Sequence, residues 1–275
     1  MSVKIAGIQM VCREDKEDNI QRALRMARVA AEKGAQIICF QELCTTHWFP
    51  RDIEEDNFRL AESIDGPTMA TMRTLAKGKG VALVFPFFEQ AGERYFNTAA
   101  VIDQGGELVG TYRKVHIPQL PLWEERSYFS GGDKGFPVFD IGLAKIGVQI
   151  CWDNFFPEGT RQLALQGAQI VFAPTAAAFA SQQRWLKVMA GNAIVNGIYV
   201  VRVNRVGKER KQDFYGMSFC ISPEGELVDE PTGLQEGILL SEIALEEVAR
   251  ARREWPFFKD RRPETYALLA GCDGL

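Results

Sequence analysis

Short apolar runs that alternate with amphipathic segments constrain the fold of this chain more than any other feature. Residues 3–9 and 36–40 are rich in apolar and β-branched side chains, which is typical of buried strands. Residues 19–33, which lie between these runs, place apolar side chains near the helical period. Strand–helix alternation of this kind favours an α/β fold in which helices pack on the faces of sheets.

The rest of the chain continues this alternation and adds hairpins. Residues 98–103 and 107–112 alternate around Asp-Gln-Gly-Gly, a turn signal, and therefore predict a β-hairpin. Residues 116–137 are irregular and rich in Pro, Gly and aromatic residues, and long loops of this type are often functional. Further helices are expected at residues 67–79, 157–166 and 182–196, and further strands at residues 81–87, 144–150, 169–173, 198–203, 216–221, 226–228 and 237–242.

The domain organisation is predicted to be simple. No internal repeat, low-complexity segment or linker divides the sequence, so we expect one domain spanning residues 1–275. The expected helices and strands fit a four-layer sandwich, although periodicity alone does not require four layers. Residues 255–275 are aromatic and basic without a clear period, and we expect this tail to lie at a subunit interface.

Charge and hydropathy argue against several classes of protein. The net charge is −4, whereas nucleic-acid-binding proteins usually carry a basic excess. The N-terminal segment MSVKIAGIQM lacks the basic region and long apolar run of a signal peptide. No apolar stretch reaches the ~18 residues that span a membrane. We therefore expect a cytoplasmic protein that binds neither nucleic acid nor membrane.

Cysteine and histidine usage favours reduced thiols over disulfides or a metal site. None of the cysteines forms a C-x-x-C pair, and a chain of this size does not need disulfides for stability. Cys44 and His47 could hold half of a zinc site, but the sequence supplies no second half. We therefore expect no metal. The cysteines are Cys12, Cys39, Cys44, Cys151, Cys220 and Cys272.

Three polar residues follow the ends of predicted strands: Glu42, Lys114 and Cys151. Ligands gather at such ends in open α/β sheets. A thiol is a strong nucleophile once it loses its proton, and a carboxylate can accept that proton. A lysine ammonium can stabilise the oxyanion that forms on an attacked carbonyl. Taken singly, each residue has an ordinary alternative: a core cysteine, a capping glutamate and a solvated lysine.

The contexts of these three residues resemble the motifs of the nitrilase superfamily. Phe40-Gln41-Glu42-Leu43 looks like the catalytic-glutamate motif, and residues 110–116 (GTYRKVH) look like the catalytic-lysine motif. Residues 147–153 (GVQICWD), followed by Phe156-Pro157-Glu158, look like the nucleophile motif. The resemblance runs from about Lys4 to about Glu242, and the three motifs occur in the family's order.

This resemblance implies an αββα sandwich that forms homodimers or larger homo-oligomers through helices near the active site. It implies a cysteine-dependent hydrolase without a metal or organic cofactor, in which Cys151 forms a thioester and Glu42 is the base. Lys114 and the backbone N–H of Trp152 would stabilise the oxyanion. A second glutamate holds the lysine in this family, and the matching position is Glu125, with Glu124 as the alternative by one register step.

Within the superfamily, the sequence most resembles the carbamoylase branch, the N-carbamoylputrescine amidohydrolases and β-ureidopropionases. These enzymes convert N-carbamoyl compounds to an amine, carbon dioxide and ammonia. The alternatives are an ω-amidase or aliphatic amidase, a nitrilase, and a catalytically dead scaffold of this fold. Predicted substrate contacts are His47, Trp48, Asp153, Phe155 and Arg184.

The loop at residues 177–185 bears on the choice of substrate. The putrescine-type enzymes carry a longer, acidic loop here, whereas this loop is short, has no acid and contains Arg184. A cationic group that is buried without a partner carries a large desolvation penalty, and a guanidinium can grip a carboxylate at two points. We therefore expect an N-carbamoyl compound with a neutral or carboxylate far end to outperform N-carbamoylputrescine.

Overall fold

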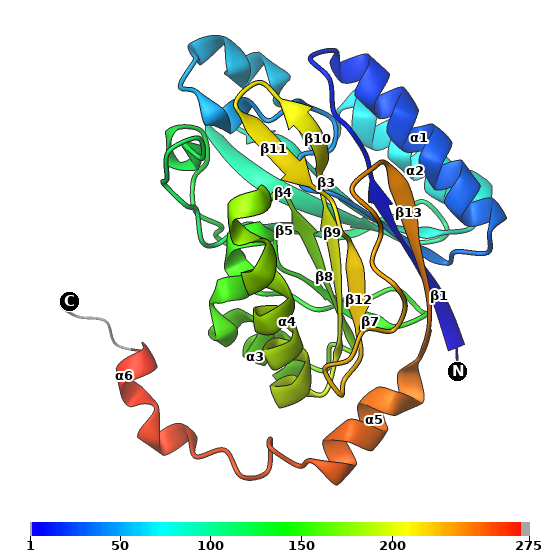
Figure 1. Cartoon of the computed structure of the whole chain (residues 1–275), viewed down its shortest axis with the longest axis vertical. Coiled ribbons are helices and arrows are strands. Elements are labelled where there is room, and N and C mark those ends of the chain that lie inside the picture. Colours follow the sequence, from blue (N-terminus) through cyan, green and yellow to red (C-terminus); the bar gives the residue numbers. More distant parts are fainter. Residues whose placement is uncertain (1, 271–275) are drawn as a thin grey trace.

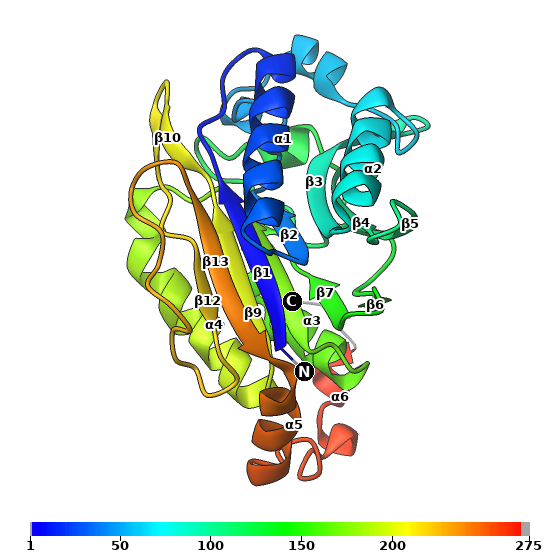
Figure 2. The same cartoon turned by 90° about the vertical axis from the view of Figure 1, so that its right-hand side faces the viewer.

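Buried apolar strands form two sheets that pack face to face in the computed structural model, which describes residues 2–270 (Figures 1 and 2). The sheets touch closely, because a Cβ on Gly7 would lie 2.8 Å from Cγ2 of Val203. The larger sheet has the strand order β13-β1-β2-β3-β4-β5. Its strands are β1 (Ser2–Gln9), β2 (Ile37–Phe40), β3 (Ala82–Ala91), β4 (Arg94–Ile102), β5 (Leu108–Arg113) and β13 (Gly237–Ala244).

The second sheet has the strand order β12-β9-β8-β7-β6, and a separate hairpin joins β10 to β11. Its central strands β7, β8 and β9 are parallel and buried, as expected for strands that helices cover. The strands of this half are β6 (Phe139–Asp140), β7 (Lys145–Val148), β8 (Ile170–Thr175), β9 (Tyr199–Asn204), β10 (Val206–Glu209), β11 (Gln212–Tyr215) and β12 (Phe219–Ile221).

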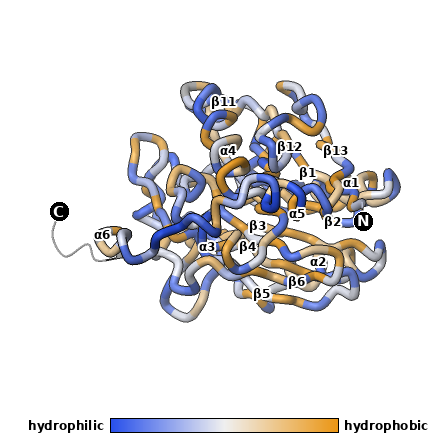
Figure 3. The backbone as a smooth tube through the Cα atoms, turned by 90° about the horizontal axis from the view of Figure 1, so that it is seen from below, coloured by the Kyte–Doolittle hydropathy of each residue, from blue (hydrophilic) through white to orange (hydrophobic). Residues whose placement is uncertain are grey.

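Helices cover the outer faces of both sheets and complete the α-β-β-α order (Figure 2). Helices α1 (Lys16–Glu32) and α2 (Pro67–Lys79) cover the larger sheet, and α3 (Pro157–Leu165) and α4 (Gln182–Asn196) cover the smaller one. Figure 3 shows mostly hydrophobic strands between these layers, whereas α5 (Leu245–Glu254) is mostly hydrophilic. The four-layer prediction is confirmed.

The remaining helix and the 3-10 turns are short. Helix α6 (Ala267–Ala270) lies beyond α5, and both lie outside the layered body in Figure 1. No helix among residues 2–270 is both long enough and apolar enough to cross a membrane. The 3-10 turns are η1 (Phe49–Arg51), η2 (Glu55–Leu60), η3 (Glu125–Ser127), η4 (Cys151–Phe155), η5 (Phe179–Ser181) and η6 (Pro263–Thr265).

The predicted helices at residues 67–79 and 182–196 are confirmed at both ends. Gly80 and Gly197 adopt left-handed backbone conformations there, with φ of 64° and 55°, and so end α2 and α4. The first helix begins earlier than predicted, at Lys16, because the Asp15 side chain accepts hydrogen bonds from the first-turn N–H groups.

Other predictions were incomplete or wrong. The strand predicted at residues 226–228 is only an isolated bridge between Leu227 and Ile221. The strand predicted at residues 216–221 begins only at Phe219, since Gly216 and Met217 have positive φ. The hairpin of β10 and β11 and the helix α5 were not predicted. The two strands are too short for a period of two to appear. The helix is so rich in charged residues that its apolar period does not stand out.

Candidate active site

Three charged side chains form a buried cluster, and two of them follow the ends of strands. Glu42 follows β2, Lys114 follows β5, and Glu125 begins η3; each of them is fully buried, at 0% exposure. The Lys114 ammonium lies 2.8 Å from Oε1 of Glu42 and 2.7 Å from Oε2 of Glu125. The predicted contact of Lys114 with Glu125 is present in the geometry, and Lys114 also contacts Glu42.

The carboxylates of this cluster are only partly hydrogen-bonded within the described residues. Asn97 Nδ2 donates to Oε1 of Glu42 at 2.8 Å. Among the described residues, Oε2 of Glu42 and Oε1 of Glu125 have no hydrogen-bond partner, although both atoms are buried. Buried polar atoms are nearly always hydrogen-bonded, so such unpartnered oxygens indicate a place where a ligand or water completes the network.

Cys151 occupies a strained turn that begins three residues after the end of the parallel strand β7, at Val148. Its φ is 47°, a left-handed value that non-glycine residues rarely adopt, and strain of this kind concentrates at functional sites. Asp153 holds the turn: its carboxylate accepts hydrogen bonds from the Ile150 N–H at 3.0 Å and from the Tyr112 hydroxyl at 2.6 Å. The Cys151 side chain is 5% exposed and reaches the floor of a cavity.

This cavity has a volume of about 620 Å³ and mostly apolar walls. Arg184 and Lys187 are its charged lining residues, and no aspartate or glutamate of residues 2–270 lines it. Arg184 is exposed, and no hydrogen bond or ion pair joins it to another described residue. The remaining lining residues are Pro118, Leu120, Trp123, Cys151, Trp152, Phe155, Ala176, Ala177, Ala178, Ser181, Trp185 and Val188.

The electrostatics of the cluster follow from burial and mutual attraction. Burial lowers the pKa of Lys114, but the facing carboxylates of Glu125 and Glu42 outweigh it and hold that pKa above the usual lysine range. Burial raises the pKa of Glu125 to about 7, although Lys114 opposes the rise. Burial also raises the pKa of the Cys151 thiol, and the charge of Glu42 adds to that rise. Loss of the thiol proton therefore requires a base before the sulfur attacks.

The structure brings most of the predicted site residues together. Glu42, Lys114 and Glu125 are in direct contact, and all of them lie close enough to Cys151 to shift its pKa. Of the two glutamates that the sequence offered as the partner of Lys114, Glu125 and not Glu124 contacts the lysine. The other residues that share the cavity with Cys151 are Trp152, Phe155 and Arg184.

Three predicted substrate contacts do not line this cavity. Asp153 is fully buried beneath the turn, where the oxygens of its carboxylate are occupied by Tyr112, Ile150 and His116. Trp48 is buried and donates its indole N–H to the Leu122 carbonyl. His47 lies beside Glu14, 3.1 Å from its carboxylate. The sequence pattern could not separate these supporting residues from cavity residues.

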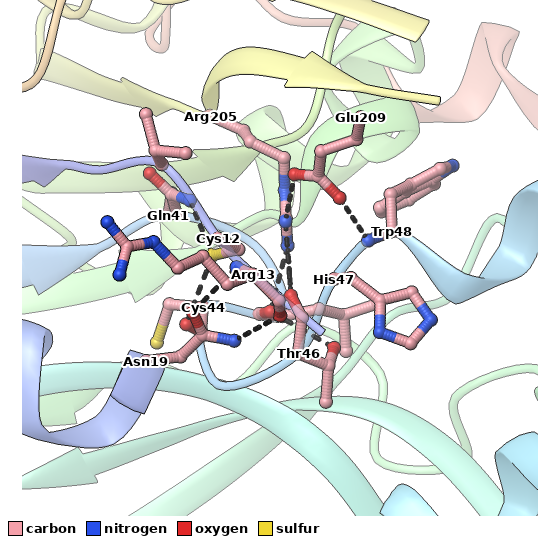
Figure 4. A network of polar contacts seen from close by, with 12 residues as sticks. Cys12, Arg13, Asn19, Gln41, Cys44, Thr46, His47, Trp48, Arg205 and Glu209 are labelled. Atoms are coloured by element: carbon pink, nitrogen blue, oxygen red, sulfur yellow. Dashed lines mark hydrogen bonds and ion pairs between the residues drawn. The ribbon is translucent and has the colours of Figure 1, made fainter. Parts of the chain in front are cut away.

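A buried arginine that had no predicted role holds the loop that carries Glu42. Arg205 pairs with Glu209 at 2.7 Å and donates to the backbone carbonyls of Glu42 and Leu43 at 3.1 and 2.9 Å. It also donates to the Thr46 carbonyl (Figure 4). Asn97, in the middle of β4, gave no signal at all.

The other cysteines among residues 2–270 do not line the cavity of Cys151. Cys12, Cys39, Cys44 and Cys220 are buried, and none of them forms a disulfide. Cys272 lies outside the described residues. Among residues 2–270, no group of three or more His, Cys, Asp or Glu side chains is arranged to hold a metal ion.

Known enzymes are similar to this chain over nearly its whole length. The chain is 40% identical to an N-carbamoylputrescine amidase of Solanum lycopersicum, over 99% of this chain and 96% of that protein. It is 35% identical to a citrullinase of Francisella tularensis, over 96% of this chain and 97% of that protein.

Solved structures are similar over nearly the whole chain. A carbon–nitrogen hydrolase from Helicobacter pylori G27 superposes with a TM-score of 0.95 at 31% identity, covering 99% of both chains. An amidase from Nesterenkonia sp. AN1, with the acetamide moiety of fluoroacetamide added covalently at its active site cysteine, superposes with a TM-score of 0.83 at 26% identity, covering 96% of this chain and 95% of that one. The family model described as carbon-nitrogen hydrolase matches residues 4–253. The chain therefore belongs to the carbon–nitrogen hydrolase family of the nitrilase superfamily.

Proposed function

We propose that this enzyme hydrolyses N-carbamoyl compounds with Cys151 as its nucleophile. The observation that carries the proposal is the position of Cys151, at the floor of a cavity and within electrostatic reach of the buried Glu42–Lys114–Glu125 cluster. The similarity to an N-carbamoylputrescine amidase and a citrullinase supports the N-carbamoyl substrate class. The covalent adduct on the amidase cysteine supports the nucleophile.

The chemistry follows from these positions. Glu42 accepts the Cys151 proton, and the thiolate attacks the carbonyl carbon of the substrate. The Lys114 ammonium and the Trp152 N–H stabilise the oxyanion. Glu42 then protonates the leaving amine as the carbon–nitrogen bond breaks, which leaves a carbamoyl thioester on sulfur.

Water completes the cycle. Glu42 accepts a proton from the attacking water, the carbon–sulfur bond breaks, and the thiol is regenerated. The carbamic acid that is released decomposes to carbon dioxide and ammonia. Glu125 holds Lys114 in place throughout, and the unpartnered oxygens of Glu42 and Glu125 are free to bind the substrate amide and the water.

The cavity favours a neutral or negatively charged far end on the substrate. Its walls are largely apolar, and its charged lining residues, Arg184 and Lys187, are both cations. A cationic tail would meet like charge there and would lose hydration without gaining a partner. We therefore propose that N-carbamoyl-β-alanine is a better substrate than N-carbamoylputrescine, although the tomato relative is named for the latter.

A side-by-side assay tests this function. The substrates are N-carbamoyl-β-alanine, N-carbamoylputrescine, N-carbamoyl-D-amino acids and simple aliphatic amides, with wild type, Cys151→Ser and Arg184→Ala. We expect turnover of N-carbamoyl compounds, loss of it in Cys151→Ser, and a lower kcat/KM for the carboxylate substrate in Arg184→Ala. A preference for simple amides would favour the amidase alternative, and full activity in Cys151→Ser would refute the nucleophile.

We also propose that the protein, a single domain, assembles as a homodimer or larger homo-oligomer through its C-terminal region. Trp255 is 60% exposed and Leu269 is 67% exposed, which is a large apolar surface for a free tail. Light scattering at micromolar concentration should report at least twice the chain mass. A monomer under these conditions would contradict the proposal.

A further inference from the structure

A second cavity, of about 390 Å³, lies along another flank of α4. It is distinct from the Cys151 cavity, although Lys187 lines both of them. Among the described residues, no aspartate or glutamate lines this second cavity. Its lining residues are Gln182, Gln183, Leu186, Lys187, Arg202, Tyr215, Met217, Phe219 and Pro231.

Arg202 is the unusual residue in this lining. It is 1% exposed, and its Nε is buried without a hydrogen-bond partner among the described residues. Its other nitrogens donate to the Tyr215 hydroxyl at 2.8 Å and, weakly, to the Met217 carbonyl at 3.4 Å. No carboxylate of residues 2–270 lies within 4.0 Å of the guanidinium.

The guanidinium is packed against aromatic faces instead. Its central carbon lies 4.8 Å from the ring centre of Trp185, 5.1 Å from that of Tyr215 and 5.6 Å from that of Phe219. Cation–π contacts offset part of the desolvation cost, but they do not supply a counter-charge. Burial lowers the pKa of Arg202, yet an arginine stays protonated at neutral pH because its ordinary pKa is so high. The cavity therefore contains a positive charge that no carboxylate of residues 2–270 neutralises by direct contact.

We infer that this cavity binds the carboxylate of a small, largely apolar anion, with Arg202 as its recognition residue. A guanidinium presents parallel N–H groups that match both oxygens of a carboxylate. Leu186, Met217 and Phe219 supply apolar contacts for the body of the ligand, and Lys187 adds a second positive charge at the cavity wall. The ligand would supply the partner that Arg202 lacks within the protein.

The anion could come from either of two sources. Trp185 lines the Cys151 cavity, and its ring lies beside the Arg202 guanidinium of the second cavity. A carboxylate at the far end of a substrate could reach Arg202 past this ring, or a separate carboxylate could occupy the site. Both cases use the same recognition chemistry.

Binding of benzoate by the intact protein tests the inference without any turnover. We expect benzoate to raise the Tm and to bind with measurable heat in wild type and in Arg184→Met, whose substitution lies in the Cys151 cavity. Affinity should fall by about tenfold or more in Arg202→Met, since a charge-assisted contact contributes ~1.5–3 kcal/mol. Benzyl alcohol, the neutral control, should not distinguish wild type from Arg202→Met. Equal benzoate affinity in wild type and Arg202→Met, or its loss in Arg184→Met alone, would overturn the site.

A second variant keeps the test valid if Arg202→Met does not fold. Leu186 is 40% exposed on α4, so Leu186→Glu should fold and place a carboxylate beside Arg202. We expect it to abolish benzoate binding, and unchanged binding would count against the site. In wild type, benzoate that raises only KM for N-carbamoyl-β-alanine identifies the substrate tail as the source, whereas a changed kcat identifies a separate anion.

Discussion

Arg202 and Arg205 are close neighbours in the sequence and equally buried, but their surroundings differ completely. Arg205 is 0% exposed and is neutralised by Glu209, and it donates to the carbonyls of Glu42, Leu43 and Thr46 (Figure 4). Arg202 is 1% exposed, and its guanidinium contacts the Tyr215 hydroxyl, the Met217 carbonyl at 3.4 Å and aromatic rings. A buried charge that the protein pairs fully holds structure together, whereas one that it leaves unpaired is available to a ligand.

The cluster of Glu42, Lys114 and Glu125 contains both a charge that is paired within the protein and polar atoms that are not paired. The Lys114 ammonium contacts Glu42 and Glu125, so its charge is compensated inside the protein. Each of those carboxylates nevertheless keeps one buried oxygen without a partner among the described residues. The lysine of this cluster is therefore paired within the protein, whereas each carboxylate keeps an acceptor oxygen that no described residue uses.

Loss of Arg205 should have the largest effect. Arg205→Met leaves the Glu209 charge and several carbonyls buried without partners, so we expect the free energy of unfolding to fall by about 3–5 kcal/mol. The kcat should fall as well, because the loop that carries Glu42 loses its anchor. Urea unfolding and steady-state kinetics measure the two effects.

The double variant Arg205→Met/Glu209→Met is the matched control. It removes both charges, so it should recover part of the stability that the single variant loses. It should not recover kcat, since the carbonyls of Glu42 and Leu43 remain unanchored. If Arg205→Met has the same free energy of unfolding as wild type, the contacts of Arg205 with Glu209 and with the loop that carries Glu42 have no structural role.

Loss of Lys114 should mainly affect the chemical step. Lys114→Met keeps bulk and removes the ammonium, and the loss of one oxyanion donor typically costs about 10²–10³ in rate. We expect kcat to fall by at least this factor while KM changes little. Circular dichroism serves as the folding control. A raised KM with a kcat near wild type would show that the oxyanion role is wrong.

Glu125 should make stability depend on pH. Burial and Glu42 raise its pKa from 4.5 to about 7 in the folded state, against the opposing effect of Lys114. The folded state thus holds the proton more tightly than the unfolded chain does, so this contribution to stability is present below pH 4.5 and is lost as pH rises through about 7. Wild type should therefore lose stability relative to Glu125→Gln across this window. A difference between the two proteins that stays constant from pH 4.5 to 7 would contradict the shift.

Loss of Arg202 should have the smallest effect on the unliganded protein. Because the charge has no counter-ion among the described residues, its replacement by an apolar side chain of similar length should leave the free energy of unfolding within about 1 kcal/mol of wild type, or raise it. Urea unfolding of Arg202→Met without added anion measures this. A loss as large as that of Arg205→Met would remove the distinction between the two arginines.

Regular local patterns made much of the fold predictable. The helices of residues 67–79 and 182–196 end at left-handed glycines, and the strands before Glu42 and Cys151 are short continuous apolar runs. The β10–β11 hairpin escaped prediction because each strand has only 4 residues, too few for a period to appear. Asp153 was predicted to contact substrate, but a carboxylate beside a nucleophile looks the same in sequence whether it faces the cavity or supports the turn.

The sequence by itself determined the layered α/β class, the strand ends that carry Glu42, Lys114 and Cys151, and the motif order that points to carbon–nitrogen hydrolysis. These features depend on neighbours along the chain. Only the tertiary structure decided which charges are paired, because Arg205 meets Glu42 across 163 positions of sequence and Lys114 meets it across 72. Such long-range contacts set burial and partners together, and for this reason two arginines in the same short segment have opposite electrostatic environments.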